Sequence, residues 1–186
     1  MNDGRPGRLV VGLTGPNAAG KGEVARLLVA HGLRYHSLSD IIREEAAARG
    51  LPPTRENLIE IGNDLRRMGG PGVLAERTLA RLTGRDIVDS IRNPAEVEVL
   101  RREPAFLLLG VDAPIEIRHA RAVARSRPGD GGTLREFAAR EDREKGTDPS
   151  AQQIHLALEM ADLRVDNSAD LGSLGRQVEA LLAGRL

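Results

Sequence analysis

Residues 15–22 read GPNAAGKG and follow the short apolar run RLVVGLT at residues 8–14. The run predicts a buried strand, and from Gly20 onward the apolar residues recur at helical spacing. A glycine-rich turn between a strand and a helix is the setting of a phosphate-binding loop, whose pattern is G-x-x-x-x-G-K followed by Ser or Thr. Gly15, Gly20 and Lys21 match this pattern, whereas Gly22 stands where the hydroxyl residue is usual.

Such a loop binds phosphate through its backbone, because glycines allow several N–H groups to point inward at phosphate oxygens. The helix that follows adds the positive end of its dipole, and the Lys neutralises the β and γ phosphates. The sequence therefore predicts a nucleotide site for ATP. Its loop residues are Gly15, Asn17, Ala18, Ala19, Gly20, Lys21, Gly22 and Glu23.

Beyond the loop, predicted strands alternate with predicted helices. Strands are expected at residues 33–40, 86–91, 105–112 and 162–167, and helices at 40–50, 52–70, 71–84, 114–127, 133–146, 151–161 and 170–184. In the helix at 52–70, Leu58, Ile61, Leu65 and Met68 fall at helical spacing, with Thr54 as the N-cap. This alternation predicts a parallel sheet with helices on both faces, whose ligands bind beyond the C-terminal ends of the strands.

Length and composition restrict the class of protein. A chain of 186 residues is long enough for one domain with its own core. The absence of Cys excludes disulfides and thiolate metal sites and agrees with a cytoplasmic location. Basic and acidic residues balance at 27 each, which argues against a general nucleic-acid binder. No apolar run approaches the roughly 20 residues of a membrane span, and residues 1–8 lack the apolar stretch of a secretory signal.

The G-K-G at residues 20–22 resembles the loop of the adenylate kinase group and related nucleoside monophosphate kinases, which commonly reads G-K-G-T. The resemblance implies an α/β, three-layer P-loop NTPase fold with a five-stranded parallel sheet in the order 2-3-1-4-5. It also implies Mg²⁺ held mainly by phosphate oxygens and water. Glu23 departs from this pattern, because the family usually has Thr or Ser there. Segments such as RNPAEVE are more similar to kinase-like proteins of archaea and to deaminase-associated kinase-like domains.

Two further segments carry the resemblance. SLSDIIREE at residues 37–45 resembles the monophosphate site of these kinases, which implies that Asp40 and Arg43 contact the acceptor and that Arg43 binds its phosphate as a fork. The alternative is an Arg that pairs with neighbouring acids. IVDSIRNPAEVEVL at 87–100 is similar to the segment that ends the third strand, which implies that Asp89 acts on Mg²⁺ through water and that Arg92 binds phosphate. The alternative for Asp89 is that its side chain only caps a helix or a turn.

A set of arginines follows the strand at 105–112. Arg118, Arg121 and Arg125 share one helical face, which is either a solvated surface or part of a lid. Arg121 and Arg125 resemble the R-x-x-x-R before the lid of adenylate kinase-like enzymes, which implies contacts with ATP phosphates and stacking on adenine. Arg140, on the next helix, is expected to close over the phosphates. The expected lid is short and helical and spans residues 118–145, and the acceptor segment spans 38–84 of a single domain, 1–186.

These inferences predict an ATP- and Mg²⁺-dependent kinase whose acceptor is a small phosphorylated molecule, with a nucleoside or deoxynucleoside monophosphate as the best candidate. The expected catalytic residues are Lys21, Asp89, Arg92 and Arg125, and the expected acceptor ligands are Asp40, Arg43, Arg92 and Arg140. Two alternatives remain. One is a kinase for a hydroxyl acceptor such as dephospho-coenzyme A, with Asp40 as the base. The other is a non-catalytic nucleotide-binding switch, favoured by Gly22 and Glu23. We expect a monomer or homodimer that binds neither nucleic acid nor membrane.

Overall fold

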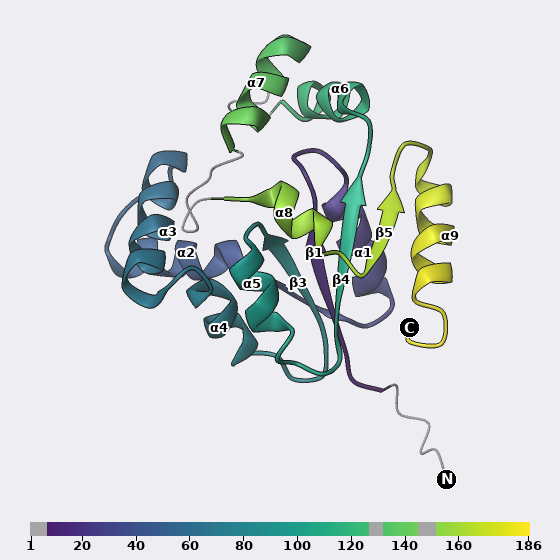
Figure 1. Cartoon of the computed structure of the whole chain (residues 1–186), viewed down its shortest axis with the longest axis horizontal. Helices are drawn as coiled ribbons and strands as arrows, with labels where there is room; N and C mark the ends of the chain where they lie inside the picture. Colours follow the sequence, from purple (N-terminus) through teal and green to yellow (C-terminus); the bar gives the residue numbers. More distant parts are fainter. Residues whose placement is uncertain (1–6, 127–131, 145–151) are drawn as a thin grey trace.

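Five parallel strands form one sheet at the centre of the computed structural model, which describes residues 7–126, 132–144 and 152–186 (Figure 1). The strands are β1 (Leu9–Thr14), β2 (Arg34–Ser37), β3 (Arg85–Ile91), β4 (Phe106–Asp112) and β5 (Leu163–Asp166). Their order across the sheet is β2-β3-β1-β4-β5, and every neighbouring pair is parallel. The predicted fold class and strand order are confirmed.

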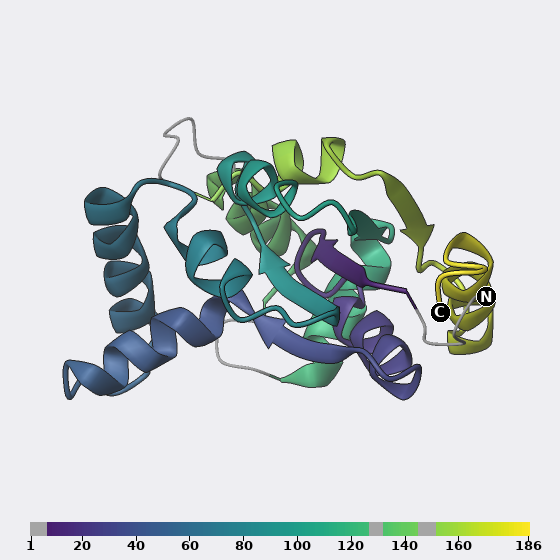
Figure 2. The same ribbon diagram turned by 90° about the horizontal axis from the view of Figure 1, so that it is seen from below.

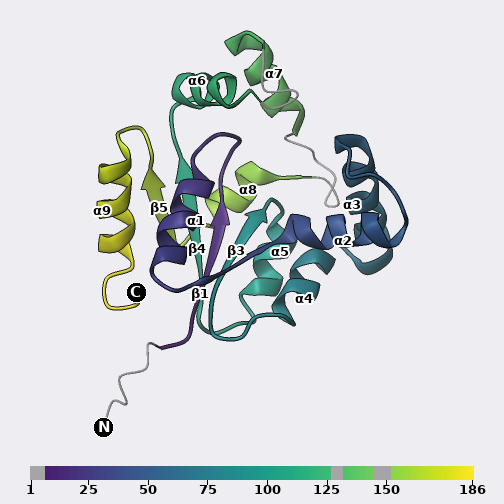
Figure 3. The ribbon, with the colours of Figure 1, turned by 180° about the vertical axis from the view of Figure 1, so that it is seen from behind.

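Helices cover both faces of the sheet, which gives three layers (Figure 2). They are α1 (Lys21–Ala30), α2 (Leu38–Ala48), α3 (Arg55–Gly69), α4 (Val73–Leu79), α5 (Pro94–Leu100), α6 (Ile115–Arg125), α7 (Leu134–Glu144), α8 (Ile154–Glu159) and α9 (Leu171–Leu181). On one face α1 and α9 pack over Val11 and Leu109, and on the other α2 to α5 and α8 pack over Val10 and Leu108 (Figure 3). Alternate residues of β1 and β4 thus enter two cores, as expected for strands buried on both faces.

Three details differ from the sequence prediction. Helix α2 begins at Leu38, because the Ser37 hydroxyl accepts the Ser39 N–H at 3.3 Å and caps the helix, so Asp40 lies in its first turn rather than at a strand end. Met68 is 73% exposed, because the last turn of α3 extends beyond the core. Helix α5 was not predicted, although its capping box of Asn93 and Glu96 is a recognisable start signal.

A β-bulge changes the register of β3 next to the phosphate loop. Gly12 pairs with Val88, but Thr14 pairs with Ile91, so β3 has one extra residue there. Within the bulge, Ser90 has a φ of 67°, a left-handed conformation that is uncommon for residues other than glycine. Bulges are frequent next to active sites, where they redirect side chains.

Across the ranges that the structure describes, no helix has the length and apolar character that a bilayer crossing demands.

Candidate nucleotide-binding site

The phosphate loop has a backbone that only glycine accommodates at two positions. Gly15 has a φ of 139°, and a Cβ there would lie 2.0 Å from the carbonyl oxygen of Val111. Gly20 has a φ of 104°, and a Cβ there would lie 2.0 Å from Nδ2 of Asn167. The glycines of the motif are therefore required by positive φ and by close packing, as in a loop whose backbone is shaped around a ligand.

Lys21 is the first residue of α1 and is partly buried. Its Nζ donates hydrogen bonds to the carbonyl oxygens of Gly15 at 2.6 Å and Pro16 at 2.9 Å. The ammonium group therefore closes the loop on itself, and the same group can be offered to a phosphate.

Other cations gather around Lys21. Burial of the ammonium group, followed by the charge of Arg92, lowers the pKa of Lys21 from 10.5 to about 8. Asp89 acts in the opposite direction, while Arg125 and Arg118 add to the lowering. The electrostatic surroundings of Lys21 are thus net cationic, and an anion bound in the loop would relieve this repulsion.

Gly22 and Glu23 lie in the first turn of α1. Gly22 is exposed, and a Cβ there would meet no atom within 4 Å. The carboxylate of Glu23 forms an ion pair with Arg26, one turn further along the same helix. Glu23 is therefore already partnered by a cation of its own helix, and its presence in place of Ser or Thr leaves the shape of the loop intact.

Two arginines of α6, Arg118 and Arg125, donate hydrogen bonds to Asn17 of the loop. Nη2 of Arg125 donates to Oδ1 of Asn17 at 3.1 Å. The guanidinium of Arg118, which is only 7% exposed, donates from Nε to the Ala113 carbonyl oxygen at 2.8 Å and pairs with Glu141 of α7. The solvated-surface alternative is therefore wrong for Arg118, because this side chain is buried between the loop and α7.

Two other arginines of the expected lid, Arg121 and Arg140, have fewer contacts that link them to the loop among the described residues. Nη1 of Arg121 is buried and has no hydrogen-bond partner among the described residues, so it is a donor available to a ligand. Arg140 lies on α7, one turn from Glu136, whose pKa is lowered by hydrogen bonds from Thr133 and, to a smaller extent, by the charge of Arg140. Residues 127–131 and residue 145 of the expected lid lie outside the described residues.

Asp89 lies near the end of β3 and Arg92 directly follows this strand, and the charges of both act on Lys21. One oxygen of Asp89 accepts the Ser90 N–H at 2.6 Å, and the other accepts the hydroxyl of Tyr35 at 2.8 Å. Among the described residues there is no cluster of three or more His, Asp or Glu side chains that could hold a metal.

The backbone and side chain of Arg92 are both held in place. Its N–H donates to Oε2 of Glu96 at 2.8 Å, and its carbonyl oxygen accepts the Gln153 N–H at 2.8 Å. Its Nη1 donates to Oε1 of Gln152 at 2.8 Å. The Arg92 guanidinium is thus preorganised next to the loop.

The proposed acceptor ligands of α2 pair with each other. Nη1 of Arg43 donates to Oδ1 of Asp40 at 2.6 Å, and about half of each side chain is exposed. This is the alternative arrangement for Arg43, an ion pair along the helix. The charge of Asp40 also acts on Tyr35, after burial and the stronger effect of Asp89.

Sequence reasoning missed Asn167, which follows β5. Its Nδ2 donates to the Ala19 carbonyl oxygen at 2.8 Å and its N–H donates to Asp112 at 2.8 Å, so it braces the loop from the far strand. Its Oδ1 is buried and has no hydrogen-bond partner among the described residues. The available signal was its position, since a polar residue after a parallel strand lies at the ligand-binding edge.

Sequence reasoning also missed a buried ion pair behind Arg92. Oε1 of Glu96 accepts a hydrogen bond from Nη2 of Arg66 on α3 at 3.2 Å, and both side chains are buried. Burial raises the pKa of Glu96, although the charge of Arg66 opposes this shift. The pair connects α3 to the turn that carries Arg92.

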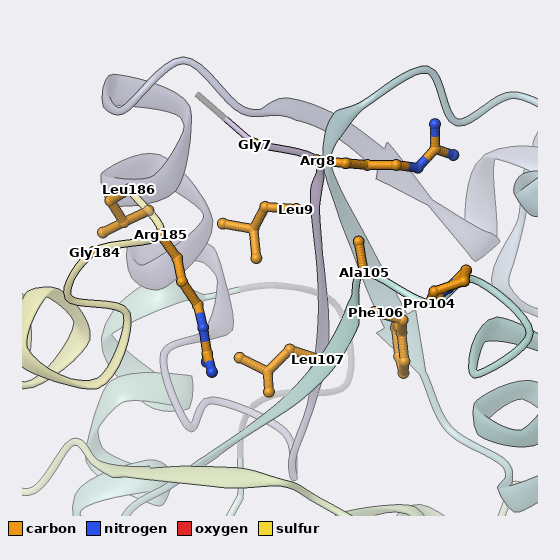
Figure 4. Close-up of a pocket in the computed structure, with 10 residues that line it drawn as sticks. All are labelled: Gly7, Arg8, Leu9, Pro104, Ala105, Phe106, Leu107, Gly184, Arg185 and Leu186. Atoms are coloured by element: carbon orange, nitrogen blue, oxygen red, sulfur yellow. The ribbon is translucent and has the colours of Figure 1, made fainter. Parts of the chain in front are cut away.

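A hollow of about 330 Å³ lies elsewhere, at the beginning of β1 and β4 (Figure 4). Arg8, Phe106 and Arg185 are among its lining residues. Arg8 is already paired with Glu103. Because nucleotides bind at the opposite, C-terminal edge of such sheets, this hollow is not the nucleotide site.

Comparisons with known proteins place the chain among archaeal relatives. A UPF0200 protein of Methanoculleus marisnigri is 37% identical over 178 residues, which are 93% of this chain and 94% of that protein. A UPF0200 protein of Methanosarcina barkeri is 31% identical and covers 95% of this chain and 96% of its own length. No family model matches the chain.

Solved structures show the same architecture. TT1252 from Thermus thermophilus has a TM-score of 0.62 at 25% identity and covers 95% of this chain and 97% of its own. Shikimate kinase from Aquifex aeolicus has a TM-score of 0.56 at 16% identity, with 95% and 97% covered. A gluconokinase from Sinorhizobium meliloti has a TM-score of 0.55 at 17% identity, with 96% and 94% covered.

These findings support a kinase-like P-loop fold but not membership of the adenylate kinase family. The archaeal relatives agree with the resemblance of segments such as RNPAEVE to kinase-like proteins of archaea. With relatives above 30% identity that span nearly the whole chain, the protein belongs to the UPF0200 family and has a kinase-like P-loop fold.

Proposed function

We propose that this protein transfers the γ-phosphoryl group of ATP to a small phosphorylated acceptor, and that the acceptor is a ribo- or deoxyribonucleoside monophosphate. The observation that carries the proposal is the cationic surroundings of Lys21, whose pKa is lowered to about 8 at the end of a glycine-shaped loop. These cations repel one another in the free protein, and a bound polyanion would relieve this repulsion.

The residues around the loop have separate roles in this proposal. The loop N–H groups and Lys21 bind the β and γ phosphates, and Arg125 and Arg121 cover them from α6. Arg92, held by Glu96 and Gln152, neutralises charge on the transferring group. An acceptor that is already an anion needs no general base, so catalysis is mainly electrostatic.

Mg²⁺ bound with the nucleotide would neutralise charge on the β and γ oxygens. The carboxylate of Asp89 fits a contact through water, since its position at the end of β3 faces the loop and its charge acts on Lys21. We further propose that residues 38–84 form the acceptor arm and residues 118–145 the lid, within one domain. Closure of the lid would exclude water and suppress hydrolysis of ATP.

A second candidate is a kinase for a hydroxyl acceptor such as dephospho-coenzyme A. The half-exposed carboxylate of Asp40, at the first turn of α2, favours it, because a hydroxyl acceptor needs a base. Shikimate kinase and gluconokinase share the fold, although at identities that support the fold alone.

The test is an assay of purified protein with ATP and Mg²⁺ against the nucleoside and deoxynucleoside monophosphates and dephospho-coenzyme A. The proposal expects ADP and a nucleoside diphosphate, and the second candidate expects ADP and coenzyme A. Lys21→Met should abolish turnover, whereas Arg185→Met, on the opposite edge of the sheet, should not change it. Tight ATP binding with no transfer to any acceptor would instead support a nucleotide-binding switch.

A further inference from the structure

The edge strand β2 presents two hydroxyls to the bulge of β3. Tyr35 and Ser37 are two positions apart on β2, so their side chains leave the same face of the sheet. The Tyr35 hydroxyl donates to Oδ2 of Asp89 at 2.8 Å, and the Ser37 hydroxyl donates to Oγ of Ser90 at 3.0 Å. Both residues of the bulge are therefore held from the same neighbouring strand.

The bulge needs such restraint. Ser90 adopts a left-handed φ of 67°, a sparsely populated conformation that persists only where its surroundings fix it. The register shift removes Asp89 and Ser90 from the regular pairing of β1 with β3. The direction of the Asp89 carboxylate is therefore set by its two hydrogen bonds, from the Ser90 N–H and from Tyr35.

We propose that Tyr35 is a positioning residue, whose phenolic hydroxyl orients the Asp89 carboxylate toward the water shell of the Mg²⁺ that accompanies the nucleotide. This inference rests on the proposed function of the site. Groups that hydrogen-bond to a carboxylate at a metal site fix its orientation and tune its strength. Burial, followed by the charge of Asp89 and the hydrogen bond to it, raises the pKa of Tyr35, so the phenol remains a donor at neutral pH.

The alternative is a hydrogen bond that only ties β2 to β3. The two readings differ in what they predict when the hydroxyl is removed and the ring is kept. A positioning role predicts a change in Mg²⁺ dependence, whereas a tie between strands predicts a loss of stability alone.

The first experiment uses the fluorescence of the protein without nucleotide. Tyr35 is the only tyrosine and the chain has no tryptophan, so tyrosine emission reports on this residue alone. A carboxylate that accepts a hydrogen bond from the phenol quenches this emission. We expect Asp89→Asn to emit more strongly than the natural protein, and we expect Mg²⁺ with ADP to change the emission of the natural protein but not of Asp89→Asn. Equal emission from the two free proteins would overturn the hydrogen bond on which the inference depends.

The second experiment compares Tyr35→Phe with Arg34→Gln. Arg34 is the neighbouring residue on β2 and faces the other side of the sheet, where it pairs with Asp86 of β3 at 3.4 Å. We expect Tyr35→Phe to raise the Mg²⁺ concentration needed for half-maximal rate by about tenfold, with unchanged binding of ADP in EDTA. Arg34→Gln should leave the Mg²⁺ dependence unchanged. Equal losses of thermal stability without a change in Mg²⁺ dependence would identify a merely structural tie.

The Mg²⁺ dependence of nucleotide binding, measured by calorimetry, separates failure of this inference from failure of the proposed function. If the natural protein transfers no phosphoryl group, Tyr35→Phe should still weaken the binding of MgADP relative to ADP in EDTA. If the natural protein is active and Tyr35→Phe has the same Mg²⁺ dependence in both rate and binding, the role of Tyr35 is wrong while the proposed function stands.

Discussion

Lys21 carries a partly buried charge that the free protein does not neutralise, which leads to a prediction on stability. Its pKa is lowered from 10.5 to about 8, so below pH 8 Lys21 is protonated in both states and the folded state carries the full cost of the buried charge. Lys21→Met should therefore abolish ATP binding and yet stabilise the free protein at pH 7 by about 1–2 kcal/mol, since the lost hydrogen bonds to Gly15 and Pro16 offset part of the gain.

Urea denaturation of both proteins at several pH values measures this effect. The advantage of the variant should shrink as the pH rises from about 8 to above 10.5, because Lys21 then loses its proton in both states of the natural protein. A variant that is less stable at pH 7 would show that Lys21 supports the loop rather than straining it.

At the level of single elements, the phosphate loop offers a matched pair of glycines. Gly20→Ser places a Cβ at a φ of 104° and 2.0 Å from Asn167, so it should cost about 2 kcal/mol and weaken ATP binding. Gly22→Ser meets no atom within 4 Å and lies in a helix, so its stability should be unchanged or slightly higher. Thermal melting and ATP titration of the two variants check this contrast, and equal losses in both would contradict it.

A buried ion pair joins Arg66 of α3 to Glu96 of α5. Arg66→Met leaves a buried carboxylate without its cation, so it should cost about 3 kcal/mol at pH 7. Burial already raises the pKa of Glu96 above its unfolded value, and removal of Arg66 raises it further. The folded variant therefore holds a proton that the unfolded chain releases near pH 4.5, and its stability should fall as the pH rises above that value.

Chemical denaturation between pH 4 and pH 7 tests whether the stability of Arg66→Met falls as the pH rises. A matched control is Arg67→Met, because Arg67 is the next residue on α3, is exposed, and forms an ion pair with Asp64 of its own helix. If both variants show the same small loss of stability at every pH, the buried pair of Arg66 with Glu96 does not contribute to the stability of the fold.

Local sequence predicted most elements, because apolar period and glycine position are local properties. The strand at 105–112 and the helix capped by Thr54 are confirmed as β4 and α3. The prediction failed at Met68 and at the missing α5, since the extent of burial along a helix and the formation of a seven-residue helix depend on what packs against them.

At the scale of the whole molecule, the loop, α6 and the end of β3 lie at the C-terminal edge of the sheet (Figure 1). The hollow lined by Arg8 lies at the beginning of β1 and β4. Binding of MgATP should therefore slow hydrogen exchange in residues 15–30 and 115–125 and leave residues 104–108 unchanged. Mass spectrometry of exchanged peptides measures both regions at once. Protection confined to residues 104–108 would contradict a nucleotide site at the C-terminal edge of the sheet.

The sequence by itself determined the phosphate loop and the alternation of strands and helices, because the spacing of glycines and apolar residues acts within a few residues of chain. Only the tertiary structure decided that Arg118 is buried, that Asn167 braces Ala19, and that Tyr35 holds Asp89, a residue 54 positions away. These contacts depend on the order of the strands and on a one-residue bulge in β3. A shift of one residue in register reverses the face of every side chain beyond it, and no local pattern specifies that shift.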